Sequence, residues 1–507
     1  MDILTNFISL IFRSHLQKIE RYADSCDVIQ RNQLNRLISE AQQTEWGKKH
    51  DFKNIKTYKD FAEKVPLQTY DSLKMFIQRM VNGEKDVLWP GEVRWFAKSS
   101  GTTNDKSKFI PVTEDILNGC HYRGGSDVAA LYLRNNPSSR LFSHQGLILG
   151  GSHSPSPLNR HAHCGDLSAV LLQNLNPLVS VIRTPRKKIV LMDEWESKMK
   201  AIVENTWKKD VSSLSGVPSW MLVLIKAVIK RAGCSYLTEV WPNMEVFFHG
   251  GINFGPYRGE YKTLIPSSNM HYMETYNASE GFFGIQDDPS DSSMLLMLDY
   301  GVFYEFIPFA EVGTANPTIL PIEEVSTGVD YAMVISTSGG LWRYQIGDTI
   351  RFTSLSPHKF VITGRTRHFI NAFGEELMVS DAEKAICDVC QETGARVKEY
   401  TAAPLFLLGD AKGRHQWLIE FEIMPPSLED FTEKLDRALK SINSDYEAKR
   451  YKGISLLPPE VIVAHEGAFY QWLKKNDKLG GQHKVPRMSN DRKMLDELLE
   501  INRSMEQ

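Results

Sequence analysis

The sequence lacks several features that would assign it to a specialised class of protein. Its 507 residues carry a formal net charge of only −3 at pH 7, which gives no global attraction to nucleic acid or anionic lipid. Six cysteines are too few for a disulfide framework and fit a reducing compartment. No apolar run reaches the roughly 18 residues that a membrane-spanning helix requires, and Asp2 stands where a secretory signal would be basic. We therefore expect a cytoplasmic protein without membrane insertion and without a nucleic-acid partner.

The composition is that of an ordinary globular protein, with 42% hydrophobic and 24% charged residues. A chain of this length exceeds what one hydrophobic core supports, so two or three domains are expected. The opening segment, residues 1–90, is predicted to be helical, because apolar residues recur at spacings of three and four in "LQKIERYADSCDVIQRNQLNRLISEAQQ". Pro66 divides two further helices, since proline disfavours helix at the preceding residue.

The pattern of apolar residues changes near residue 140. Short apolar runs such as "GLILGG", "EVFFHGG", "MLLMLDYGVFYEFI" and "YAMVIST" predict strands, and they alternate with helical segments such as "WESKMKAIVENTWKK". This alternation predicts a large mixed α/β domain over residues 1–364. Beyond it, "QWLIEFEI" and "EVIVAH" predict strands around a capped helix in "SLEDFTEKLDRALKSIN", which indicates a small α+β domain over 365–507. Gly364 is the expected hinge, because glycine absorbs changes in φ and ψ.

Residues 99–108, "SSGTTNDKSK", combine hydroxyls, a glycine and lysines, which suits a phosphate-binding loop. A Walker A loop is excluded, because only four residues separate Gly101 from Lys106 and no second glycine precedes that lysine. The alternative is a solvated turn.

Three later stretches point to the same ligand. "YNASEG" at 276–281 sets a ring four residues before a carboxylate, so that the ring could stack on a base while the acid reaches a metal-bound phosphate. "YQIGD" at 344–348 ends in an acceptor for a ribose diol, and "TGRTRHFINAFGEEL" places Arg365 beside the hinge. Each also has a structural alternative: a core aromatic, a turn acid or a surface charge.

Two cysteine motifs remain open. Cys387 and Cys390 form a CxxC in "SDAEKAICDVCQE", a predicted helix capped at Ser380 or Asp381, where cysteines at this spacing commonly pack in a core. The "HAHC" at 161–164 offers His161, His163 and Cys164. Zinc binding is the alternative for both, although neither has the regular spacing of a zinc site.

Taken in order, these motifs resemble those of the adenylate-forming superfamily of acyl-CoA synthetases, luciferases and peptide-synthetase adenylation domains. Nearly the whole chain is more specifically similar to the auxin-responsive acyl-acid-amido synthetases, the Gretchen Hagen family, and to its relatives outside plants. The similarity is carried by "DFAEKVPLQTYDSLKMFIQRMVNGE", "SSGTTNDKSKFIP", "SGVPSW", "YNASEGFFG", "NSDYEAKR" and "GGQHKVPR". It implies a large adenylate-forming domain with a small, rotating C-terminal domain.

The resemblance also implies roles for individual residues. ATP phosphates would be held by Ser99, Ser100, Gly101, Thr102, Thr103 and Lys108, and the nucleoside by Tyr276, Ser279, Asp348 and Arg365. Glu280 would bind Mg²⁺, and Lys484 would be carried into the site by the small domain. The catalytic residues would accordingly be Lys484, Glu280 and Lys108. Gln345 departs from the family, because it stands where relatives usually have arginine.

The implied activity is ATP-dependent activation of a carboxylic acid as an acyl-adenylate, with release of pyrophosphate, followed by transfer of the acyl group to an amine, expected to be an amino acid. An acyl-CoA ligase that uses the same intermediate and a non-catalytic nucleotide-binding protein are the alternatives. The identities of the acid and acceptor, and the oligomeric state, do not follow from the sequence.

Overall fold

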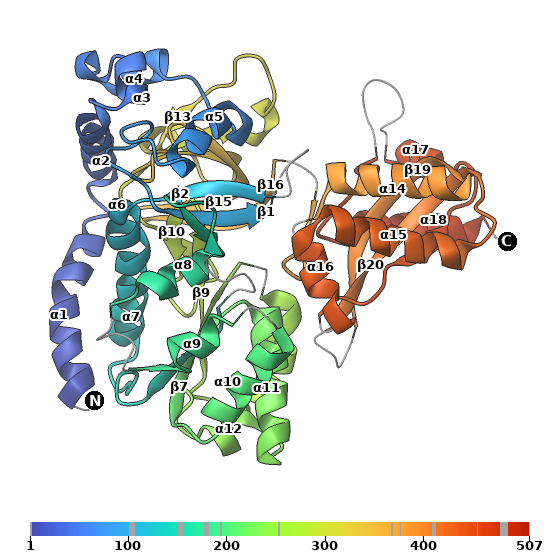
Figure 1. Cartoon of the computed structure of the whole chain (residues 1–507), viewed down its shortest axis with the longest axis horizontal. Coiled ribbons are helices and arrows are strands. Elements are labelled where there is room, and N and C mark those ends of the chain that lie inside the picture. The colour runs from blue at the N-terminus through green and yellow to red at the C-terminus, as the bar shows by residue number, and fades with distance from the viewer. Residues whose placement is uncertain are drawn as a thin grey trace. The chain divides into compact units, whose positions relative to one another are not determined.

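The computed structural model describes residues 3–100, 107–150, 156–176, 182–192, 195–251, 254–366, 369–375, 377–407, 412–453, 455–476 and 485–505. The chain folds into two compact units, a large one built mainly from residues up to Thr366 and a small one built mainly from the residues after it. Both are shown in Figure 1. The predicted α/β class is confirmed, whereas the boundary at 364/365 and the rotation of the small domain stay predictions.

The structure has helices at the opening of the chain. The main ones are α1 (Ile3–Glu20), α2 (Cys26–Ala41), α4 (Tyr58–Lys64) and α5 (Tyr70–Val81). Pro66 lies between α4 and α5, as predicted. Thr57 and Thr69 cap these two helices with side-chain oxygens that accept backbone N–H groups, which fixes where each helix begins.

A twelve-stranded mixed sheet forms the centre of the large unit, in the order β13-β12-β14-β15-β16-β11-β10-β9-β8-β7-β3-β6. The strands are β3 (Gln145–Ile148), β6 (Arg183–Thr184), β7 (Val211–Gly216), β8 (Val246–Gly250), β9 (His271–Ala278), β10 (Gly281–Ile285), β11 (Met294–Leu296), β12 (Val302–Pro308), β13 (Leu320–Pro321), β14 (Asp330–Thr337), β15 (Tyr344–Leu355) and β16 (His358–Arg365). β9 is parallel to β8 and antiparallel to β10, so the parallel and antiparallel halves of the sheet meet at β9.

Helices α10 (Trp195–Thr206) and α11 (Pro218–Ala232) pack together beside β7 (Figure 1). A second, four-stranded sheet has the order β2-β1-β5-β4 and contains β1 (Trp95–Ser100), β2 (Ser107–Val112), β4 (Ser156–Pro157) and β5 (His163–Gly165). Because ligands of open α/β sheets bind beyond the carboxyl ends of parallel strands, the end of β9 is the expected place for a site.

The small unit holds a three-stranded sheet of β19 (Arg396–Phe406), β20 (Gly413–Ile423) and β21 (Glu460–Val463). Its longer helices are α14 (Val379–Thr393), α15 (Leu428–Ile442) and α18 (Lys493–Ser504). Ser427 caps α15, as the sequence predicts, by accepting the N–H of Asp430. The α+β architecture follows the predicted strand and helix segments.

Two local predictions are wrong. The run "MLLMLDYGVFYEFI" does not form one strand, because the chain turns between β11 and β12, where Gly301 adopts a φ of 71° that glycine tolerates at no steric cost. Neither Ser380 nor Asp381 occupies the cap of α14. Met378 does, and the Asp381 carboxylate accepts its backbone N–H from within the first turn.

Gly364 lies inside β16, where it pairs with Thr349, and its role as a hinge stays a prediction. None of the helices in the described part of the chain is both long and apolar enough to span a bilayer.

Candidate nucleotide site

The β9–β10 hairpin carries three of the predicted site residues. Ala278 and Gly281 pair across the strands, so Ser279 and Glu280 form the turn between them. Tyr276 precedes the turn on β9, and its ring lies 5.1 Å from that of Phe283 and 6.2 Å from that of Phe360, measured between centroids. The aromatic contacts hold the Tyr276 ring in place, so the hairpin presents a fixed ring followed by a carboxylate.

Asp348 on β15 joins this group. Its carboxylate accepts a hydrogen bond from the Tyr276 hydroxyl, and both side chains are buried, with 5% and 8% of their surface exposed. The backbone of Asp348 pairs with that of Arg365 at the end of β16. The structure therefore brings together Tyr276, Asp348 and the backbone of Arg365, and the turn with Ser279 and Glu280 follows directly on β9.

Lys108 lies on β2 of the smaller sheet. Its Nζ is 5.8 Å from the centroid of the Tyr70 ring, and the Tyr70 hydroxyl accepts the N–H of Phe109 at 2.8 Å. The hydrogen bond to Tyr70, the first residue of α5, holds the backbone next to Lys108 against that helix. A role of Lys108 at the phosphates stays a prediction.

Several predicted residues lie wholly or partly outside the described part of the chain. Ser99 and Ser100 end β1, but the description of these two residues and of Arg365 covers the backbone alone. Gly101, Thr102, Thr103 and Lys484 are not among the described residues. Their placement at the nucleotide stays a prediction.

Glu280, the predicted magnesium ligand, offers one protein carboxylate at the turn between β9 and β10. Mg²⁺ in nucleotide enzymes is commonly bound by one or two carboxylates together with substrate phosphates. The described residues contain no group of three or more His, Cys, Asp or Glu side chains placed to hold a metal. Glu280 is buried, with 8% of its surface exposed, and its role as the magnesium ligand stays a prediction.

A buried ion pair that the sequence analysis missed anchors the start of β15. The Arg343 guanidinium donates to Glu305 at 2.8 Å and to the carbonyl of Val65 at 2.7 Å, and the Tyr58 hydroxyl donates to Glu305 at 2.9 Å. Arg343 also adopts a left-handed φ of 44°, which is strained for a residue with a side chain. These contacts fix the chain five residues before Asp348.

Gln345, where relatives usually have arginine, takes part in this local structure through its backbone. Its N–H donates to the carbonyl of Gln68 at 2.9 Å, and it pairs with Val334 on β14. The buried cation in this stretch is therefore Arg343, two positions earlier. No pattern in the sequence distinguishes a buried arginine from a surface one, which is why it was missed.

The "HAHC" residues contact different partners. Nδ1 of His161 is 3.6 Å from the Glu92 carboxylate, whereas the ring of His163 is 5.1 Å from that of Trp95. Cys164 is buried and pairs with Phe96 of β1. These contacts assign the motif to packing around the smaller sheet.

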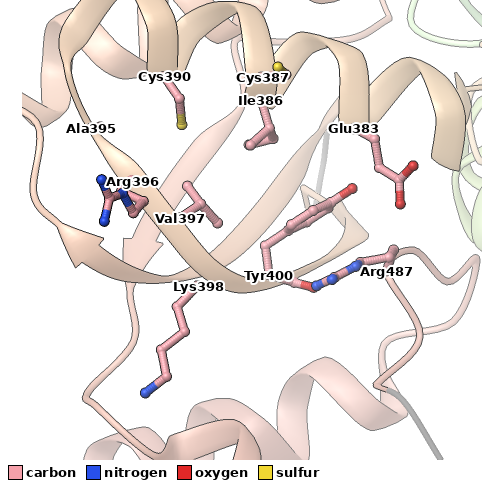
Figure 2. A pocket seen from close by; sticks show the side chains of 10 residues that line it. All are labelled: Glu383, Ile386, Cys387, Cys390, Ala395, Arg396, Val397, Lys398, Tyr400 and Arg487. Atoms are coloured by element: carbon pink, nitrogen blue, oxygen red, sulfur yellow. The ribbon is translucent and has the colours of Figure 1, made fainter. Parts of the chain in front are cut away.

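The CxxC borders a pocket of about 290 Å³ in the small unit, between α14 and β19 (Figure 2). Cys390 points from the helix toward β19, while Cys387 is exposed. Burial raises the pKa of the Cys390 thiol, which disfavours a thiolate. Tyr400 and Arg487 complete one wall, and the lining residues include none of the predicted nucleotide-site residues.

The sequence matches three models of one protein family. These are the GH3 family N-terminal domain over residues 15–270, the central domain over 295–365 and the C-terminal domain over 380–493. The chain is 24% identical to an indole-3-acetic acid-amido synthetase of Arabidopsis thaliana, with 93% of this chain and 91% of the relative covered. It is 23% identical to a 4-substituted benzoates-glutamate ligase of the same plant, with 86% and 88% covered.

Solved structures agree in fold. An acyl acid amido synthetase, GH3.15, superposes with a TM-score of 0.61 at 19% identity and covers 97% of this chain and 96% of its own. A 2-hydroxyisobutyryl-CoA ligase superposes with a TM-score of 0.57 at 13% identity and covers 94% and 92%. Since one family model alone spans more than half of the sequence, the chain belongs to the GH3 family.

Proposed function

We propose that the protein is an ATP-dependent acyl acid amido synthetase, which activates a carboxylic acid as its adenylate and transfers the acyl group to an amine. The observation that carries the proposal is the convergence of Tyr276 and Asp348 at one buried point, beside the turn that holds Glu280. Family membership and the printed activities of the curated relatives, acid-amido synthetases and a benzoate-glutamate ligase, support it.

In the first step, a carboxylate oxygen of the acid attacks the α-phosphorus of ATP. A new phosphorus–oxygen bond forms, the bond to the bridging oxygen of the β-phosphate breaks, and pyrophosphate leaves with the bonding electrons. Tyr276 flanks the adenine, and the Asp348 carboxylate accepts hydrogen bonds from the ribose hydroxyls. The main-chain amides and hydroxyls of residues 99–103 and the ammonium of Lys108 hold the phosphates.

Glu280 holds the magnesium ion, which when bound neutralises charge on the phosphate oxygens. Lys484 contributes an ammonium between the acid and the α-phosphate, where it stabilises the charge that builds on phosphorus. Loss of such a group costs on the order of 10² to 10³ in rate.

In the second step, the amine nitrogen attacks the acyl carbon. The carbon–oxygen bond to AMP breaks, AMP departs with the electrons, and the nitrogen loses a proton. Adenylation supplies the leaving group that a free carboxylate lacks. An amino acid is the proposed acceptor because one curated relative is named for joining benzoates to glutamate.

A screen of pyrophosphate release over a library of carboxylic acids tests the first step, and mass spectrometry of the products tests the second. We expect acid-dependent release and an amide product when amino acids are supplied. A thioester with CoA and no amide would reassign the protein as an acyl-CoA ligase. ATP binding without turnover on any acid would favour a non-catalytic role.

A further inference from the structure

A short π-helical turn lies against the hairpin that carries the candidate site. The turn, η2 (Leu117–Tyr122), separates α6 (Glu114–Ile116) from α7 (Arg123–Asn135) and contacts β10. A π turn contains one residue more than an α turn, which leaves side chains out of the regular helical register, and such turns are frequent at functional sites. It is therefore relevant to the site which residues of the hairpin the side chains of this turn contact.

Two adjacent residues of η2 bind the two strands of the hairpin. Sγ of Cys120 accepts the N–H of Phe282 at 3.1 Å. Nδ1 of His121 lies 2.9 Å from Oδ1 of Asn277. Asn277 and Phe282 face each other across β9 and β10, in the pair next to the one that closes the turn. A single cross-strand pair is therefore held from both strands by consecutive side chains.

The helix also approaches the hairpin too closely for a side chain at Gly124. A Cβ atom built there would lie 2.5 Å from a ring carbon of Phe282. The absence of a side chain at this position therefore lets the ring lie against the start of α7. This packing contact is independent of the two hydrogen bonds and limits movement of the same residue.

The imidazole of His121 is neutral and bonds to Asn277. The side chain is buried, and burial lowers its pKa to about 4, so the ring is neutral at physiological pH. With Nδ1 donating to Asn277, Nε2 is left as an acceptor, and it has no hydrogen-bond partner among the described residues. Because an unsatisfied buried polar group destabilises the fold, a histidine here needs a reason beyond core packing.

We infer that Cys120 and His121 form a clasp on the Asn277–Phe282 pair which holds the β9–β10 turn, and with it Glu280, in the position that adenylation requires. His121 is thus a positioning residue that acts through Asn277. Only the expected effect of the clasp on the rate of adenylation rests on the proposed function. The hold on the hairpin itself is a property of the unliganded protein and can be measured without substrate.

Two substitutions at position 121 test whether the Nδ1 donor, and not the size of the imidazole ring, holds the hairpin. In His121→Asn the amide nitrogen takes the place of Nδ1 and retains the donor to Asn277. In His121→Gln it takes the place of Nε2, and the donor is lost. A third variant, Gly124→Ala, pushes on Phe282 without touching the hydrogen bonds. His50→Gln is the control, because His50 makes a similar bond to the carbonyl of Lys64 on the opening helices.

The first readout is hydrogen exchange of the peptide that spans residues 276–284, measured on the full chain without nucleotide. The second is the rate of acid-dependent pyrophosphate release, together with the Kd for ATP. We expect His121→Gln and Gly124→Ala to accelerate exchange of this peptide and to lower the rate about tenfold, the effect of one lost hydrogen bond. His121→Asn should recover both values to within about threefold, and His50→Gln should change neither.

Equal exchange and equal rates in the Gln and Asn variants would overturn the clasp. Faster exchange without a change in rate would overturn its role in positioning, while the hold on the hairpin would stand. If the wild-type protein adenylates no acid, the proposed function fails, and the clasp is then decided by exchange alone: faster exchange in the Gln variant but not in the Asn variant supports it, and no difference refutes it.

Discussion

The hydroxyl of Tyr276 donates a hydrogen bond to the buried carboxylate of Asp348, across 72 positions of sequence. The bond ties β9 to β15, two strands that are not neighbours in the sheet. It therefore holds two strands of the candidate nucleotide site together.

Tyr276→Phe is expected to destabilise the fold by about 1 to 3 kcal/mol, because a buried carboxylate loses a donor. It should also weaken ATP binding. Tyr122→Phe is the matched control, since that hydroxyl donates to the neutral carbonyl of Leu171 and its loss costs about 1 kcal/mol. Urea unfolding of Tyr276→Phe, of Asp348→Asn and of the double variant Tyr276→Phe/Asp348→Asn measures the coupling between the two side chains. Strict additivity of the two changes would contradict a direct Tyr276–Asp348 bond.

Glu280→Gln is expected to lower acid-dependent pyrophosphate release by about 10² to 10³ and to raise the magnesium concentration needed for half-maximal rate. The physical reason is loss of the charge that holds the ion, while the shape of the side chain is kept. Titration of the rate with Mg²⁺ checks this, with the exposed Glu324→Gln as control. An unchanged magnesium dependence would remove Glu280 as the ligand.

Lys484→Ala is expected to abolish acid-dependent pyrophosphate release and to spare ATP binding, because its ammonium acts on charge that develops during the reaction. Calorimetry with ATP and a pyrophosphate assay measure the two effects separately. Lys475→Ala, an exposed lysine at the end of α17 (Ala468–Lys475), serves as control. Release at the wild-type rate would exclude Lys484 from the mechanism.

Arg343→Met is expected to cost about 3 to 5 kcal/mol of stability, because it leaves the Glu305 carboxylate buried without its partner. A surface pair, Arg351 on β15 with Asp330 on β14, offers the comparison, and Arg351→Ala should cost less than about 1 kcal/mol. Denaturant unfolding gives both values. Similar losses for the two variants would mean that the buried pair contributes no more than an exposed one.

The stability of the wild-type protein should fall more steeply on acidification than that of His121→Asn. The folded pKa of about 4 lies below the ordinary 6.5, so as the pH falls through this interval the unfolded chain binds a proton that the folded chain refuses. The stability is therefore complete above about pH 6.5 and is lost toward pH 4, by about 3 kcal/mol in total. All other ionisable groups are the same in the two proteins, so the difference between the two profiles isolates His121. Parallel pH profiles would contradict the lowered pKa.

Much of the architecture could be predicted because the relevant signals are local. The break at Pro66 and the cap of α15 at Ser427 depend on residues within a few positions, and both are found where expected. The split of the run 294–307 was missed, because continuous apolar character does not reveal a turn inside it. Gly301 was the available signal.

The residues of the candidate site could be predicted from the sequence, but the hydrogen bonds between them could not. Short motifs identified Tyr276, Glu280 and Asp348, yet nothing local says that a tyrosine hydroxyl meets an aspartate on a distant strand. Arg343 and His121 were missed for the same reason. Their partners, Glu305 and Asn277, lie 38 and 156 positions away, and only the folded chain brings them together.

The extra residue in η2 has a consequence for how this chain aligns with its relatives. Removing one residue between Leu117 and Tyr122 would convert the π turn to ordinary α-helix, with the backbone ladder intact but the preceding side chains rotated by about 100°. A relative with a one-residue gap at this place, which an alignment would treat as trivial, would therefore lack the register that places Cys120 and His121 against the hairpin.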